Sequence, residues 1–259
     1  MTGQKEKIDL ILSRLHDKGL FNGNVLVATN GKILLKKSYG VADFRDQTPL
    51  QLQSVFRIAS VSKQFTAMAV MILRQEGKLL YDDPLRKFFP DFPYPSVQIR
   101  HLLSHTSGLP DYISQFYTHT PEMMTYASNQ NVVDWIMGDQ PPLHFPPGSQ
   151  WAYSNTNYVL LAELVAKLSR HAFPDFLRAH IFDPLEMENT FLFKYSEALN
   201  VPHRVYGFYP DNQTLYDDNF LNKILGDGGD IFQPGRSVSL GSGPVYKPAP
   251  GTGSFTGGI

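Results

Sequence analysis

The sequence contains no cysteine among its 259 residues. Disulfide bonds, iron–sulfur clusters, cysteine-based zinc sites and a thiol nucleophile are therefore excluded. An excess of charge of one sign is missing as well, because 23 Lys and Arg residues stand against 24 Asp and Glu residues, for a formal net charge of -1. A protein without a basic field is not expected to bind nucleic acid.

Long hydrophobic runs are also missing. The most apolar stretch, Phe65–Leu73, is about half as long as the roughly 18 residues that a membrane span needs. Residues 1–20 place apolar side chains at helical spacing between charges, whereas a secretory signal needs an unbroken apolar block. We expect a surface helix there that ends at Gly19. As written, the chain is predicted to be soluble and cytoplasmic, or periplasmic or secreted if a signal peptide has been removed.

Hydrophobic residues make up 42% and aromatic residues 13% of the chain, which indicates a globular protein of one large or two small domains. Asn30-Gly31 supplies the positive φ angles of a type I′ turn, so a β-hairpin is predicted over about 24–38. Between Ser62 and Glu76 apolar residues recur every three or four positions and Gly77 follows as a cap, which predicts a helix. Further helices are expected at about 97–104, 121–127, 131–137, 156–169 and 174–181.

The composition changes after Asp230. Residues 233–259 are rich in Gly and Pro and show almost no apolar periodicity, so they cannot bury enough surface to offset the entropy of ordering them. We predict a mobile tail at 233–259 and one domain over 1–232. A helix and a hairpin are expected up to about residue 60, followed by a mainly helical region at about 61–195.

Ser60 and Lys63 are the first candidates for chemistry. They lie three residues apart, which on a helix is one turn and one face. A serine hydroxyl needs a base within hydrogen-bond reach, and a desolvated lysine can serve as one. The spacing alone is expected about once by chance, so a helix-start serine followed by a solvated lysine fits it as well.

Tyr153 and Asn155 form a second candidate pair before the helix expected at 156–169. In an extended segment residues i and i+2 project to one side. The phenol could pass a proton to a leaving group, and the Asn amide offers a donor and an acceptor to a substrate amide. The alternative is an aromatic packing residue followed by a helix cap.

Other polar candidates are weaker. His101 and His105 are four residues apart, which suits two metal ligands on a helix, but no H-E-x-x-H pattern accompanies them. No metal site is therefore expected. His203 is expected at the surface, and Asp111 and Asp134 as helix caps or on solvated faces.

Aromatic residues are candidates to line a cleft for an apolar acyl chain. They are Trp135, Trp151 and the Phe and Tyr residues within 112–126. Core packing is the alternative, and we expect it for most of them. Tyr112 and Phe116 are the expected exceptions.

Several segments occur in an order that is informative as a set: Phe56–Ala67, Glu76–Leu79, Asp82–Pro84, His101–Leu109, Pro147-Gly148 and Tyr153–Asn155. Together they resemble the serine β-lactamase and penicillin-binding protein superfamily. The resemblance is to its class C β-lactamase-like branch, which includes esterases and D-aminopeptidases, and it extends over about residues 20–230.

The resemblance implies an α+β fold of the β-lactamase/transpeptidase type, with an antiparallel sheet flanked by helices and a mainly helical region. It implies a serine hydrolase that acts on an ester, a β-lactam or a D-amino-acid peptide. Ser60 would form an acyl-enzyme, and Lys63 would take or steer the serine proton. Tyr153 would share the base role and protonate the leaving group, while Asn155 would position the substrate amide. No metal or organic cofactor is implied.

The sequence departs from this family after residues 226–229. A strand with a Lys-Thr-Gly or His-x-Gly motif is expected there, but Lys247 is separated from Gly251-Thr252-Gly253 by a segment containing two prolines. We therefore predict an incomplete sheet in a truncated or frame-shifted relative with weak turnover. Self-association is one way to cover such a sheet. The alternative function is a catalytically silent binding module of the same fold.

Overall fold

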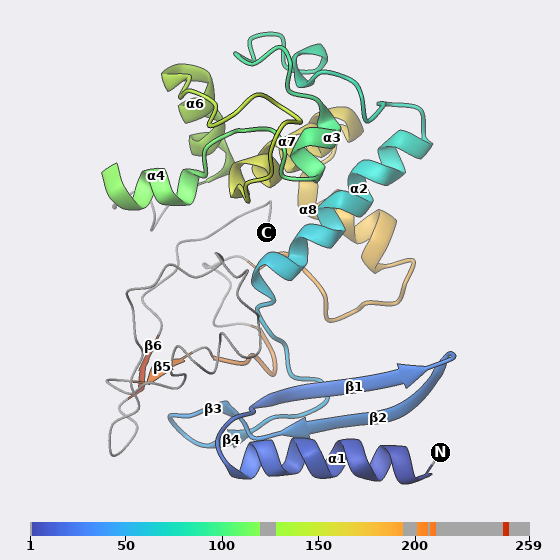
Figure 1. The fold of residues 1–259 in the computed structure, drawn as a ribbon. Coiled ribbons are helices and arrows are strands. Elements are labelled where there is room, and N and C mark those ends of the chain that lie inside the picture. Colours follow the sequence, from blue (N-terminus) through green and yellow to red (C-terminus); the bar gives the residue numbers. More distant parts are fainter. Residues whose placement is uncertain (1, 120–127, 194–200, 207, 211–245, 249–259) are drawn as a thin grey trace. The chain divides into compact units, whose positions relative to one another are not determined.

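The computed structural model describes residues 2–119, 128–193, 201–206, 208–210 and 246–248 (Figure 1). The chain divides into two compact units. One unit consists of Met1–Phe56 with Val201–Gly251, and the other of Arg57–Asn200 with Thr252–Ile259. The helix expected at 121–127 and most of the tail expected at 233–259 lie outside the described residues.

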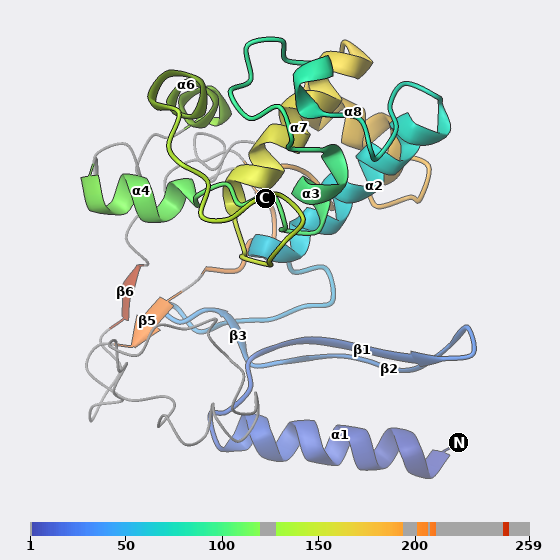
Figure 2. The same ribbon diagram turned by 45° about the horizontal axis from the view of Figure 1, so that its top comes forward.

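The first unit begins with α1 (Thr2–Asp17) and a hairpin of β1 (Gly23–Thr29) and β2 (Lys32–Tyr39). Its turn has φ angles of 49° at Asn30 and 72° at Gly31, as a type I′ turn requires. The helix lies along the hairpin (Figure 2). The predictions of an N-terminal helix and a hairpin at 24–38 are confirmed.

A carboxylate ties α1 to the second strand of the hairpin. Asp9 accepts hydrogen bonds from Lys37 Nζ at 2.6 Å and from the Tyr39 hydroxyl at 2.8 Å. The bond from Lys37 is the largest of the interactions that lower the pKa of Asp9. The helix is thereby held in register with the strand on which it packs.

The remaining strands of the first unit are short: β3 (Val41–Asp43), β4 (Thr48–Pro49), β5 (Phe208–Pro210) and β6 (Tyr246–Pro248). The described strands form three separate antiparallel pairs, β1 with β2, β3 with β4 and β5 with β6. β6 falls inside the segment expected to be a tail. The predicted α+β class with an incomplete sheet is confirmed, while self-association stays a prediction.

The second unit is helical. Its elements are η1 (Ala59–Ser62), α2 (Lys63–Gln75), η2 (Leu85–Lys87), α3 (Ile99–Leu103), α4 (Tyr112–His119), α6 (Asn129–Asp139), α7 (Asn155–Ser169), α8 (Phe173–Leu177) and η3 (Arg178–Phe182). The helices expected at 62–76, 97–104, 131–137, 156–169 and 174–181 are confirmed. Helix α4 was not predicted from the sequence, because its aromatic and polar residues have ordinary rather than strong helix propensity.

Helix α7 lies at the centre of the second unit, and α2, α3, α6 and α8 pack on it (Figures 1 and 2). Leu160, Leu161 and Leu164 are completely buried. A helix that is apolar on all sides is stable only when other elements surround it. None of the described helices has the length and apolar character that crossing a bilayer requires.

Two aromatic residues of α4 belong to the core. Tyr112 and Phe116 are each 2% exposed, and their rings meet edge to face at 5.6 Å. Phe116 also meets Trp135 at 5.8 Å. The expectation that Tyr112 and Phe116 line a cleft is therefore wrong, because α4 turns both rings towards the helices beneath it.

Gly108 lies in the loop between α3 and α4, where the backbone approaches Phe145 too closely for a side chain. Its φ is +77°, and an added Cβ would lie 2.2 Å from the carbonyl oxygen of Phe145. We expect Gly108→Ala to lower the free energy of unfolding by at least about 2 kcal/mol. Thermal or urea unfolding would measure this loss.

Gly138→Ala is the matched control, because Gly138 lies in α6 and an added Cβ would meet nothing within 4 Å. It should raise the free energy of unfolding by up to about 1 kcal/mol. Equal stability of the two variants would contradict the close approach at Gly108.

Candidate active site

Ser60 lies in the short turn η1, directly before α2, and its side chain is exposed. The preceding Ala59 has a φ of 45°, a left-handed conformation that is costly for a residue with a Cβ. Such strain is held only where the surrounding structure enforces it, and it is concentrated at functional sites. The turn places the Ser60 Oγ 3.3 Å from Lys63 Nζ, at the start of α2.

Lys63 is only 6% exposed. Its Nζ donates to Asn155 Oδ1 at 2.7 Å and lies 5.0 Å and 5.4 Å from the ring centres of Tyr153 and Tyr158. None of the ion pairs between described residues involves Lys63. The amine is therefore shielded from water and held by a neutral amide, a hydroxyl and two aromatic faces.

Tyr153 reaches the same serine from a distant loop. Its hydroxyl donates to Ser60 Oγ at 2.7 Å, and the residue is 41% exposed. His105 holds this loop: its carbonyl accepts the Ala152 N–H at 3.0 Å and its Nδ1 accepts the Ser154 N–H at 3.2 Å. The His105 and Tyr153 rings also face each other, with centres 4.5 Å apart.

Buried polar side chains fix the first turn of α7 to the segment before α4. Asn157 Oδ1 accepts from the Ser107 hydroxyl at 2.7 Å, and both side chains are buried. Thr156 Oγ1 accepts the Tyr112 N–H at 3.0 Å and donates to the Pro110 carbonyl at 2.7 Å. Because buried polar groups need partners, these bonds leave the two segments little freedom to shift.

The structure thus brings Ser60, Lys63, Tyr153 and Asn155 together. It adds Asp111, which the sequence reading treated as a cap or surface residue. Asp111 Oδ1 does accept the Ile113 N–H at 3.0 Å, but Oδ2 accepts from Asn155 Nδ2 at 2.8 Å. Burial raises the pKa of Asp111, and its hydrogen bonds from Ile113 and from the backbone and side chain of Asn155, together with the charge of Lys63, oppose this shift.

His105 was not predicted to bind a metal. Burial, and then the charge of Lys63, lower its pKa to about 4, so the imidazole is neutral at pH 7. His101 Nδ1 accepts the Gln98 N–H at 3.2 Å at the start of α3. Among the described residues, no three His, Asp or Glu side chains gather into a possible metal site. The sequence did contain an indication for both residues: His105 lies within the His101–Leu109 motif, and Asp111 lies two residues after its end.

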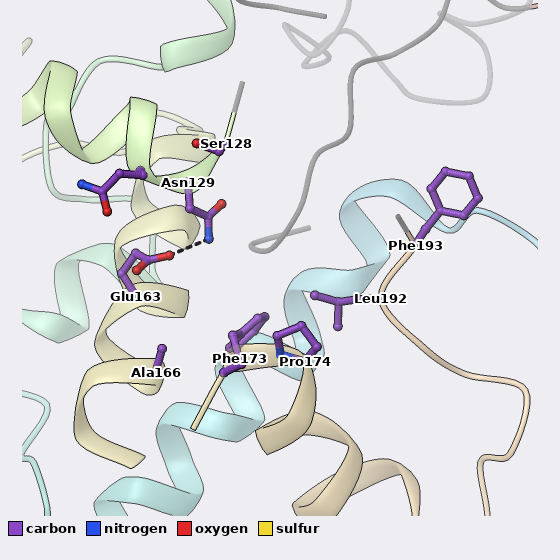
Figure 3. Close-up of a pocket in the computed structure, with 10 residues that line it drawn as sticks. Ser128, Asn129, Glu163, Ala166, Phe173, Pro174, Leu192 and Phe193 are labelled. Atoms are coloured by element: carbon purple, nitrogen blue, oxygen red, sulfur yellow. Dashed lines mark hydrogen bonds between the residues drawn. The ribbon is translucent and has the colours of Figure 1, made fainter. Parts of the chain in front are cut away.

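A cavity of about 320 Å³ lies between the start of α6, the middle of α7 and the start of α8. Figure 3 shows Glu163 on α7, whose Oε1 accepts from Asn129 Nδ2 at 3.0 Å, with Phe173 and Leu192 also on the cavity wall. Of the described residues that line it, none is Ser60 or one of the groups that contact Ser60. We place the chemistry at Ser60 because converging proton donors and acceptors, rather than volume, determine where a nucleophile is activated.

His105 predicts a pH dependence of stability. Since its pKa falls from 6.5 to about 4 on folding, the folded state favours the neutral ring. The stabilisation is complete above pH 6.5 and is lost as the pH falls through about 4. We expect His105→Asn to lose less stability than the wild type over this interval, as measured by urea unfolding at several pH values.

Asn suits this test because it tolerates the left-handed φ of 57° at position 105 and offers an oxygen to the Ser154 N–H. Other groups that titrate in the same interval are common to both proteins. Equal slopes of stability against pH would show that the imidazole is not held neutral by the fold.

The chain is similar to known proteins along most of its length. Penicillin-binding protein 4* of Bacillus subtilis (strain 168) is 39% identical over 239 residues, which are 87% of this chain and 52% of that protein. Protein flp of Staphylococcus aureus (strain MW2) is 32% identical over 195 residues, 72% of this chain and 38% of that protein. The chain spans about half or less of the length of these curated relatives.

Solved structures show the same similarity. A penicillin-binding protein from Bacillus halodurans has a TM-score of 0.68 at 28% identity, covering 77% of this chain and 60% of that one. D-amino acid amidase from Ochrobactrum anthropi SV3, complexed with L-phenylalanine amide, has a TM-score of 0.64 at 30% identity, covering 80% and 57%.

The match also extends to a family model. The model described as beta-lactamase matches residues 8–232, which include every residue of the Ser60 site and both segments that hold it. With this match covering most of the sequence, the chain belongs to the beta-lactamase family.

Proposed function

We propose that the protein is a serine hydrolase that forms an acyl-enzyme at Ser60. The observation that carries the proposal is the convergence of two proton-carrying groups on one hydroxyl. Tyr153 Oη lies 2.7 Å and Lys63 Nζ 3.3 Å from Ser60 Oγ. A nucleophile within hydrogen-bond reach of a base, which is itself oriented by a third group, is the arrangement that activates serine. Asn155 is that third group, because it fixes Lys63.

The reaction begins when Ser60 Oγ attacks the substrate carbonyl carbon. As the Oγ–C bond forms, the hydroxyl proton passes to Lys63 in its neutral amine form or to Tyr153 in its phenolate form, both of which lie against Oγ. The bond from the carbonyl carbon to the leaving oxygen or nitrogen then breaks, and Tyr153, which is partly exposed, returns a proton to that atom. Water hydrolyses the Ser60 ester and regenerates the hydroxyl.

The substrate class follows from the relatives and from Asn155. Beyond its bonds to Lys63 and Asp111, the Asn155 amide keeps one N–H and one lone pair for a substrate amide. Penicillin-binding proteins and a D-amino acid amidase are among the relatives. We propose an ester, a β-lactam or a D-amino-acid peptide or amide as substrate.

A second candidate is a catalytically silent binding module that keeps the Ser60 site. The sequence observation that favours it is the lack of a Lys-Thr-Gly or His-x-Gly motif after residues 226–229. Loss of one oxyanion-hole donor costs about 10²–10³ in rate. Saturable β-lactam binding without a change in intact mass would support this candidate, and a stoichiometric adduct on Ser60 would refute it.

Covalent labelling tests the nucleophile. We expect a fluorophosphonate or a fluorescent penicillin to label the wild type and not Ser60→Ala, with one adduct per chain by intact-protein mass spectrometry. Ser62→Ala is the matched control, because Ser62 lies in the same turn and its side chain makes no capping bond. The wild type and Ser62→Ala should turn over nitrocefin or p-nitrophenyl esters, and Ser60→Ala should not. Equal labelling of wild type and Ser60→Ala would end the proposal.

Tyr153→Phe tests the proton transfer. The variant keeps the ring against His105 and Lys63 but removes the hydroxyl that contacts Ser60. General acid–base catalysis contributes about 10²–10⁴ in rate, so we expect acylation to slow by that order. Thermal unfolding should be nearly unchanged, since Tyr153 is partly exposed. An unchanged acylation rate would remove Tyr153 from the mechanism.

A further inference from the structure

The two carboxyl oxygens of Asp111 accept hydrogen bonds from different directions. Its Oδ1 caps the start of α4 through the Ile113 N–H, and its Oδ2 accepts from Asn155 Nδ2 at 2.8 Å. None of the ion pairs between described residues involves Asp111. The cap accounts for one oxygen, and the second oxygen acts only on Asn155.

The carboxylate determines which way the Asn155 amide faces. A carboxylate accepts hydrogen bonds and cannot donate them. Asn155 must therefore turn its NH₂ group towards Asp111, which leaves Oδ1 facing Lys63 Nζ at 2.7 Å. The flipped amide would set oxygen against carboxylate and NH₂ against the amine, so both contacts would become repulsive.

The same chain of contacts links two charges. Lys63 is buried and touches neutral partners, and the Asn155 amide lies between its amine and the Asp111 carboxyl group. Hydrogen bonds in series polarise one another, which strengthens both ends of the chain. Asp111 is thus a counter-charge for Lys63 without contacting it.

The surrounding titratable groups are Tyr112, Tyr153, Tyr158 and His105. Burial raises the pKa values of Tyr112 and Tyr158 and, with the charge of Lys63, lowers that of His105, so these three groups are neutral at pH 7. Among the described residues that surround Lys63, Asp111 is therefore the carboxyl group; burial raises its pKa, and the charge of Lys63 opposes that shift.

We propose that Asp111 is a positioning residue of the site: it orients the Asn155 amide, and through that amide it holds the Lys63 amine on Ser60 and balances its charge. The proposal rests on the proposed acyl-enzyme function, because it assigns Asp111 to the activation of Ser60. Asp111 touches neither Ser60 nor a reacting atom, so its effect passes through Asn155 and Lys63.

Asp111→Asn and Asp111→Ser test the proposal in the full chain. Both residues still cap a helix, which preserves the start of α4. Asn offers one oxygen to two donors and has no charge, and Ser has neither the charge nor the reach to Asn155. Asp134→Asn is the matched control, because Asp134 is exposed on α6 and, among the described residues, accepts from Gln130 Nε2 alone. Thermal unfolding of all variants verifies that they fold.

The first measurement is the rate of fluorophosphonate labelling between about pH 5.5 and 9.5. We expect both Asp111 variants to label about ten- to hundredfold more slowly than the wild type. We also expect their pH–rate profiles to move to lower pH, because loss of the carboxylate destabilises the protonated amine. The Asp134 variant should match the wild type. A slower rate with an unmoved profile would reduce Asp111 to a structural role and overturn the proposal.

The second measurement does not depend on activity. The ¹⁵Nζ resonance of Lys63, assigned with Lys63→Met, is titrated in each protein. We expect Lys63 to lose its proton at lower pH in both Asp111 variants than in the wild type and the Asp134 variant. A midpoint that is the same in all of them would overturn the proposal. A wild type that is never labelled would refute the proposed function instead, and this titration would still decide the role of Asp111.

Discussion

The docking of residues 105–112 onto the first turn of α7 is the constraint on which the site depends. Its bonds are buried and polar: Ser107 donates to Asn157, and Thr156 bonds both Pro110 and Tyr112. Leaving such a group without its partner costs about 1–3 kcal/mol, so the two segments move together or not at all. One junction therefore fixes Tyr153 at the end of its loop, Asn155 at the start of α7 and Asp111 before α4.

Two residues near the nucleophile have strained backbone conformations. Ala59, directly before Ser60, and His105, which holds the Tyr153 loop, both have left-handed φ angles, 45° and 57°. Each is unfavourable for a residue with a Cβ, and such strain persists only where the surrounding structure enforces it. The exposed Ser60 therefore directly follows a residue in an uncommon backbone conformation.

The charged groups of the site are buried and separated by neutral groups, and they form no direct ion pair among the described residues. Lys63 is wrapped by two aromatic rings and an amide, Asp111 lies one amide away, and His105 is kept neutral by burial and by the nearby amine. Direct contact with a carboxylate would favour the protonated amine. All these groups belong to the unit formed by Arg57–Asn200 with Thr252–Ile259.

Sequence alone determined what is local. Apolar periodicity predicted α2, α6 and α7, Asn30-Gly31 predicted the hairpin turn, and the ordered motifs indicated the family and the pairs Ser60–Lys63 and Tyr153–Asn155. Tertiary structure decided the rest, because the bond from Tyr153 to Ser60 spans 93 positions and that from Asn155 to Asp111 spans 44. No spacing along the chain reports such contacts. Burial by distant segments keeps the His105 imidazole neutral and places the Tyr112 ring in the core. Contact between distant segments also brings Asp111 to Asn155. Solvent is excluded from these groups only when those segments meet.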